Sequence, residues 1–259
     1  MTAAVAQSAY MTQRHARVLI RQPWFLAITL VQPIIWLLLF GAMFRSVTEI
    51  PGFGSGGSYL DYLVPGVVVM TALFSSGWSG MGIIEDMDRG LMDRFLVSPV
   101  HRSSLIAGRV AYEAIALVLQ ATIICGLALL LGAKFEGGPV GFAVLVLCAV
   151  LLAAAFASLS DASALLLRQR ESVIGINTLM VLPLTFVSAA FLPLALAPDW
   201  IATVARVNPV NWAVEAGREA LLANADWSLI LPRLGGLLIM ALVCLGLATR
   251  AFRSYQRSA

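Results

Sequence analysis

Acidic and imidazole side chains are the first candidates for chemistry in this sequence. Asp86, Asp88 and Asp93 could together hold a divalent cation, because carboxylate oxygens are its preferred ligands. These aspartates alternate with apolar residues, however, as on the solvated face of a helix. His15 and His101 lie far apart, and no HExxH motif is present. The residues therefore predict no catalytic site and no metal site.

Nucleotide hydrolysis by this chain is excluded by its single lysine. A phosphate-binding Walker A loop needs glycine before its lysine and serine or threonine after it. Lys134 instead lies between Ala133 and Phe135. Any ATP chemistry must come from a partner. The three cysteines have no CxxC spacing and imply no disulfide or metal site.

The densest charge pattern lies at residues 85–97. Here six charged residues alternate with apolar ones, which predicts a short amphipathic helix. The charged positions are Glu85, Asp86, Asp88, Arg89, Asp93 and Arg94, and the apolar ones include Leu91, Phe95 and Leu96. Ser98 and Pro99 end the helix, since a residue before proline avoids helical geometry. The helix could lie on a membrane surface, or it could present its side chains to a cytoplasmic partner.

The overall composition indicates whether water or lipid surrounds the chain. Of the 259 residues, 60% are hydrophobic and 12% charged, and the mean hydropathy is +0.89. Soluble domains are about 45–50% apolar and about 25% charged. Lipid must therefore solvate part of the chain. The net charge of +3 is typical of basic cytoplasmic loops and not of a nucleic-acid-binding surface, because the arginines are dispersed between apolar runs.

Six apolar runs are long enough, or nearly so, to cross a bilayer as helices. We expect an all-α membrane protein of one domain, 1–259, with spans at about 25–44, 63–84, 106–131, 140–159, 173–192 and 229–249. The first run is longer than a signal-peptide core, so we expect it to be retained. With the N-terminus inside, 12 of the 17 basic residues are cytoplasmic. Both termini are therefore predicted to be cytoplasmic.

Two amphipathic segments border these spans. Residues 10–22 carry Arg14, Arg17 and Arg21 at helical spacing, which predicts an elbow helix on anionic lipid headgroups. A purely anchoring role for it remains open. Residues 193–224 form an external segment, in which short helices should start near Pro198 and Pro209. Its tryptophans, Trp200 and Trp212 among them, indicate that it dips into the outer interface.

Several prolines, small residues and charged residues lie in or beside the predicted spans, where apolar residues are the norm. Pro33 and Pro183 each remove a backbone hydrogen bond and should kink the first and fifth spans, either beside a pathway or in an inert bundle. Small residues between Ser75 and Gly82 predict a helix-packing face. Arg109 is expected to pair with Glu113, one turn away. Asp161 is assigned to the inner loop after the fourth span.

Two motifs give the chain a family resemblance. Residues 88–100, DRGLMDRFLVSPV, are similar to the E-R-G-T-x-E-R-L-x-x-[ST]-P stretch of type-2 ABC exporter permeases, the group of daunorubicin-resistance and nodulation-factor export permeases. Aspartates replace the usual glutamates, which keeps the charge. The second motif, FLP at 191–193, PDW at 198–200, NP at 208–209 and then Arg218, resembles the family's external segment before the last span. With the predicted spans and elbow, the resemblance covers nearly the whole chain.

The resemblance implies a bacterial inner-membrane exporter subunit for a hydrophobic or amphipathic substrate, such as a drug, lipid or glycolipid. Two copies, or one copy and a paralogue, would bind two cytoplasmic ATPases that carry the ATP and magnesium. Residues 85–97 would be the coupling helix, completed by Gly90, Ser98 and Pro99, and the first, second and fifth spans would line the pathway. The external gate would comprise Pro193, Pro198, Trp200, Asn208, Pro209, Trp212 and Arg218. The alternative is a membrane-embedded enzyme or a non-transporting scaffold.

Overall fold

Residues 23–44, 58–91, 102–191 and 193–258 are described by the structure, a computed structural model. Within these ranges every regular element is a helix. Four of the described helices are long and apolar enough to cross a membrane, and Ala27–Met43 is a shorter apolar helix. The predicted all-α membrane class is thereby confirmed. The predicted elbow, with Arg14, Arg17 and Arg21, lies outside the described residues.

The first and third predicted spans correspond to α2 (Pro23–Met43) and α6 (Arg102–Leu130). The second is longer than predicted and divided in two. It comprises α3 (Tyr59–Gly77) and α4 (Ser79–Asp88), separated at Trp78. The α3 helix starts four residues earlier than predicted because Ser58 caps it. Its side chain accepts a hydrogen bond from the Leu60 N–H, and Asp61 accepts one from the Ser58 N–H.

Three later spans also differ from their predicted bounds. The fourth is α7 (Gly138–Leu167), and the last is α11 (Trp227–Ser258), both well beyond the predicted ends. The helix at the predicted fifth span is α8 (Arg170–Phe186), which stops at Val187 instead of continuing to residue 192 and is not one of the four long apolar helices. An apolar run marks the part of a helix inside lipid, whereas backbone hydrogen bonding continues into water. The predicted bounds are therefore too short where polar residues continue the helix.

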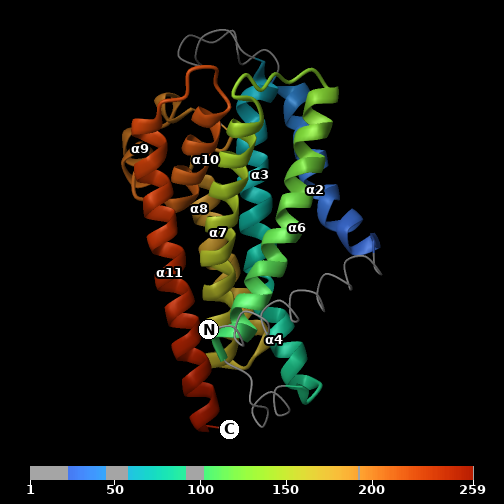
Figure 1. Ribbon diagram of the computed structural model, residues 1–259, viewed down its shortest axis with the longest axis vertical. Helices are drawn as coiled ribbons and strands as arrows, with labels where there is room; N and C mark the ends of the chain where they lie inside the picture. The colour runs from blue at the N-terminus through green and yellow to red at the C-terminus, as the bar shows by residue number, and fades with distance from the viewer. Residues whose placement is uncertain (1–22, 45–57, 92–101, 192, 259) are drawn as a thin grey trace.

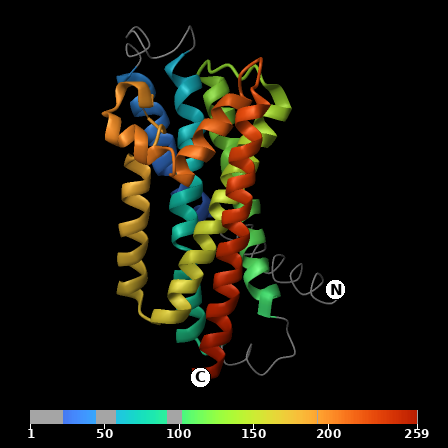
Figure 2. The same ribbon diagram turned by 90° about the vertical axis from the view of Figure 1, so that its left-hand side faces the viewer.

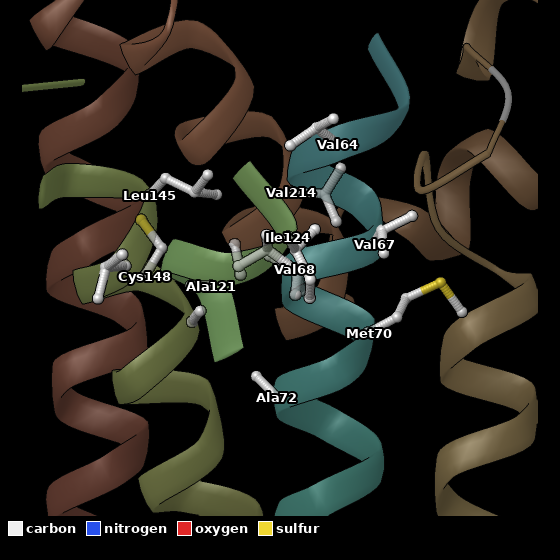
Figure 3. Close-up of a cluster of buried hydrophobic side chains, with 14 of the residues drawn as sticks. Val64, Val67, Val68, Met70, Ala72, Ala121, Ile124, Leu145, Cys148 and Val214 are labelled. Atoms are coloured by element: carbon white, nitrogen blue, oxygen red, sulfur yellow. The ribbon is translucent and has the colours of Figure 1, made fainter. Parts of the chain in front are cut away.

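The long helix α7 is the centre of the bundle. It contacts α3, α4, α6, α8, α11 and the short α10 (Pro209–Ala220). Figures 1 and 2 show α10, the 3₁₀ turn η2 (Leu194–Leu196) and α9 (Asp199–Ala205) at one end of the bundle, and α4 at the other. A buried apolar cluster joins α3, α6, α7 and α10 (Figure 3). Its side chains include Val64, Val68, Ala121, Ile124, Leu145, Cys148 and Val214.

Close backbone contact holds α3 against the chain that follows α8. A Cβ atom added at Gly66 would lie 2.2 Å from the Ala190 carbonyl oxygen, which is backbone and cannot rotate away. A Cβ at Gly246 on α11 would meet open space. Both glycines lie inside helices, so the intrinsic helix preference of alanine favours both substitutions equally.

We predict that Gly66→Ala destabilises the protein and that Gly246→Ala does not. Overpacking of this kind costs about 1–3 kcal/mol, or about 5 °C in the midpoint of thermal unfolding. The midpoint can be followed by size-exclusion chromatography after heating in detergent. Equal midpoints for the two variants would contradict the close contact.

Candidate coupling site

The predicted coupling helix does not begin at residue 85. Glu85, Asp86 and Asp88 form the last turn of α4, which continues the second span. The Gly90 N–H bonds to the Met87 carbonyl oxygen at 2.9 Å, and Gly90 has a φ of +65°. A glycine with positive φ is a common helix terminator, so one helix over 85–97 is wrong. A helical residue resumes at Leu91, and Asp93, Arg94, Phe95, Leu96, Ser98 and Pro99 lie outside the described residues.

Arg109 on α6 contacts α4 near both of its ends. The Arg109 Nη1 atom lies 3.1 Å from Asp86 Oδ2, and its Nη2 atom donates to the Ser79 carbonyl oxygen at 2.9 Å. Ser79 and Asp86 stand at the two ends of α4, so a single guanidinium bridges both. A Cβ atom at Gly82 would lie 2.3 Å from Arg109 Nη2. Glycine at that position therefore makes room for the arginine.

The same guanidinium faces a buried carboxylate on α7. Asp161 was expected in a loop, but α7 continues to Leu167 and leaves its side chain 0% exposed. Its Oδ2 atom lies 3.9 Å from Arg109 Nε. Among the described residues, Arg109 is the basic side chain within ion-pair distance of it. Arg109 thus pairs with Asp86 and Asp161, and not with Glu113 as predicted.

A second ion pair joins the end of α4 to the start of α8. The Arg170 Nη2 atom lies 2.6 Å from Asp88 Oδ2, and both side chains are about half exposed. A third pair, between Arg89 and Glu85 at 3.5 Å, stays within one turn. Exposed pairs contribute about 0–1 kcal/mol each. The two exposed pairs therefore add little to stability.

The small-residue face predicted for the second span is confirmed at its contact with α7. Ser160 Oγ accepts from the Gly80 N–H at 3.0 Å and donates to the Gly77 carbonyl oxygen. This hydroxyl joins the two sides of the break at Trp78. The break between α3 and α4 is therefore stabilised from α7, close to Asp161.

At the opposite end, the predicted starts of both external helices are confirmed. Pro198 precedes α9, and Pro209 is the first residue of α10. The Asn208 side chain caps α10 by accepting from the Val210 N–H at 2.9 Å. Trp200 is exposed, and Trp212 Nε1 donates to the Arg206 carbonyl oxygen at 2.7 Å. Pro193 precedes η2.

The sequence did not predict that α10 holds the end of α8. Asn208 Nδ2 donates to the Leu184 carbonyl oxygen, and Asn211 accepts from the Ala189 N–H at 2.9 Å. Arg218 donates to the Ala189 carbonyl oxygen at 2.9 Å, and its guanidinium lies 3.5 Å from the centre of the Tyr62 ring. These side chains satisfy backbone groups that the helix leaves unpaired. Their role as a gate stays a prediction.

The two intrahelical prolines lie where the sequence placed them. Pro33 is inside α2, and Pro183 is inside α8, one turn before the helix ends. The Val187 N–H bonds to the Pro183 carbonyl oxygen at 2.9 Å as the final helical bond. Whether either proline borders a pathway stays a prediction.

We predict that Arg109→Gln is strongly destabilising and that Asp161→Asn in the same protein recovers much of the loss. Removing Arg109 takes away the hydrogen bonds to Asp86 and Ser79 and leaves the Asp161 side chain buried without the cation that faces it, which costs about 2–3 kcal/mol or several degrees in the unfolding midpoint. Arg170→Gln is the matched control, since its pair with Asp88 is exposed. Equal midpoints for the two single variants would contradict a buried network.

Comparison with known proteins identifies the family. The model of the ABC-2 type transporter family matches residues 6–222. A chain named as a transport permease, ycf38, of Cyanophora paradoxa is 30% identical over 212 residues, 80% of this chain and 71% of the relative. The daunorubicin resistance ABC transporter permease protein DrrB1 of Streptomyces coeruleorubidus is 27% identical, over 76% and 68%. The inner membrane transport permease YadH of Escherichia coli K12 is 24% identical, over 78% of each chain. The chain therefore belongs to the ABC-2 type transporter family, as a membrane permease.

Proposed function

We propose that this permease forms the translocation pathway of an ATP-driven exporter and hydrolyses no ATP itself. A separate cytoplasmic ATPase, in two copies, binds the ATP and magnesium. The observation that carries the proposal is the fastening of the α4 end to α6, α7 and α8 through Arg109 and Arg170. The family-like motif at residues 88–100 continues directly from that end. A push on the motif would therefore reach three other helices.

The substrate is hydrophobic or amphipathic. Support comes from the relative DrrB1, whose name assigns it to daunorubicin resistance, and from the apolar character of the helices. The four long apolar helices each contain a long stretch with few charged residues, which disfavours an ion pathway. Drugs, lipids and glycolipids all fit this class.

The functional unit is a pair of permeases, either two copies or one copy and a paralogue. The helix α8 supports this arrangement, because Leu179 is 75% and Phe186 is 73% exposed on a helix with three buried residues. The helix α2 has a similar apolar surface, with Ile28 68% exposed. Such surfaces suit either lipid or a second subunit. In this proposal α2, α3 and α8 line the pathway between the subunits.

The proposal includes the arrangement of the helices in the membrane. Six spans, formed by α2, α3 with α4, α6, α7, α8 and α11, cross a bacterial inner membrane, and both termini are cytoplasmic. Residues 10–22 lie as an elbow helix on the inner lipid surface. The segment 193–224 closes the outer end of the pathway, where α10 holds the chain after α8.

The direct test is a detergent pull-down of the chain from its native membranes, with mass spectrometry of the co-purifying proteins. We expect an ABC ATPase in equal amount. Arg94→Glu should reduce the recovered ATPase at least about tenfold, because the substitution places like charge against a docking surface. Arg206→Glu, at an exposed position at the opposite end of the bundle, is the matched control and should leave recovery unchanged.

Recovery of the chain alone, from membranes in which other complexes survive extraction, would contradict the exporter proposal. That result would favour a membrane-embedded enzyme or a scaffold. Full ATPase recovery with Arg94→Glu would leave the exporter intact and remove the coupling role from this segment.

A further inference from the structure

A cavity of about 510 Å³ lies at the end of the bundle opposite α4. It is lined by η2, by α9 and the residue after it, by α10 and by the start of α11. The helices α9, α10 and the start of α11 lie together at this end (Figures 1 and 2). Sites for drug-sized ligands measure about 300–1,000 Å³, so the space can hold a molecule of that size.

Part of the lining is apolar. Its apolar and aromatic side chains belong to Leu194, Ala195, Ala202 and Trp212. The Trp212 ring is held on two sides. Its Nε1 atom donates to the Arg206 carbonyl oxygen at 2.7 Å, and a Cβ atom added at Gly236 on α11 would lie 3.2 Å from a ring carbon. The cavity therefore offers a fixed aromatic surface to an apolar group.

The charged side chains of the lining leave one positive charge without a partner. Arg233 Nη2 pairs with Glu215 Oε2, and Arg233 Nη1 donates to the Leu229 carbonyl oxygen at 3.2 Å. This pair is neutral as a whole. Arg206 is exposed, and among the described residues it has no ion pair. Two arginines and one carboxylate thus give the cavity an excess of one positive charge.

An asparagine in the same lining keeps a hydrogen-bond donor. Asn211 is 2% exposed, and its Oδ1 atom accepts from the Ala189 N–H at 2.9 Å. Its Nδ2 atom donates to no group in the described part of the chain, yet this atom is not completely covered. The small exposed area of Asn211 lies at the cavity that it lines. The lining therefore combines an unpaired guanidinium with an unused amide donor.

These features select the chemistry of a ligand. A carboxylate or a phosphate accepts hydrogen bonds from both a guanidinium and an amide N–H, and bonds of this charged kind are about twice as strong as neutral ones. Its negative charge compensates that of Arg206. An apolar group attached to the anion contacts Trp212 and Leu194. A neutral group of the same shape leaves the charge of Arg206 uncompensated.

We propose that this cavity binds the anionic head of an amphipathic molecule, a phosphate or a carboxylate, and that the attached apolar group lies on the Trp212 ring. The anion lies against Arg206 and Asn211. Such a head comes either from a phospholipid at the outer surface of the membrane or from an amphipathic anion dissolved in water. That the ligand is a transported substrate rests on the proposed exporter function; the binding itself does not.

Quenching of tryptophan fluorescence tests the proposal on the purified full chain in a non-ionic detergent, without ATPase or nucleotide. The probes are 4-bromobenzoate, which is an anion, and 4-bromobenzamide, which has nearly the same shape and no charge. Bromine quenches a tryptophan in contact with it. We expect saturable quenching with an apparent affinity about tenfold higher for 4-bromobenzoate, in the range of one hydrogen bond to a charged group.

Variants separate binding in the cavity from partition into detergent. Arg206→Gln should abolish the preference for the carboxylate, and it should fold because the side chain is exposed. Arg253→Gln, exposed on α11 at the other end of the bundle, is the matched control and should keep the preference. Trp212→Phe should remove most of the saturable signal, and Trp24→Phe on α2 should leave it unchanged. Equal affinity for the two probes, or a preference that survives Arg206→Gln, would overturn the proposal.

Competition identifies the source of the anion. Displacement of 4-bromobenzoate by phosphatidylglycerol in the micelles would support a lipid head group as the ligand. A preference for the carboxylate that phosphatidylglycerol does not reduce would support an amphipathic anion from water. Inorganic phosphate has no apolar group, so its displacement of 4-bromobenzoate at equal concentration would overturn an amphipathic ligand.

The outcomes separate from those of the pull-down. Selective binding of 4-bromobenzoate by a chain that recovers no ATPase would support the ligand site in a non-exporting protein. Recovery of an ATPase by a chain without that selectivity would overturn the ligand site and leave the exporter intact. Arg206→Glu should lose the ligand and still recover the ATPase, because the cavity and the coupling site lie at opposite ends of the bundle.

Discussion

A fully buried acidic side chain faces a single arginine, and this contact organises the α4 end of the bundle. Asp161 is completely covered on α7, and Arg109 on α6 lies against it. The same guanidinium holds both ends of α4, and glycine at position 82 leaves room for it. Three helices therefore share one charged group. Apolar side chains in place of Arg109 and Asp161 could pack as well, but they would not link the position of α4 to that of α7.

The two ends of the bundle use different interactions for different tasks. At the α4 end, charges bridge helices, and the chain leaves towards the family-like motif. At the α10 end, the amides of Asn208 and Asn211 and the guanidinium of Arg218 satisfy the backbone where α8 stops. Non-helical backbone at this depth is tolerated only when protein groups satisfy it. One end is thus held by charges that join helices, and the other by polar side chains that satisfy the backbone after α8.

The sequence predicted the features that follow from local rules and missed those set by distant partners. Apolar runs located the long helices, and proline at a first helical turn located α9 and α10. Asp161 was misplaced because a carboxylate suggests water, and its partner Arg109 is far away in the sequence. The early end of α8 depends on Asn211 and Arg218, which come later in the chain. Gly90 was a local signal for the end of a helix. The prediction of one helix over residues 85–97 ignored this signal and was wrong.

Distance measurement between spin labels tests the central claim, that Arg109 fixes α4 to the bundle. Labels on Arg89→Cys and Leu130→Cys mark the α4 end and the far end of α6, and the native cysteines are buried. Electron–electron double resonance should give one narrow distance distribution for the otherwise native protein and for Arg170→Gln. With Arg109→Gln the distribution should broaden or divide in two. An unchanged narrow distribution would contradict the claim and assign the position of α4 to apolar packing alone.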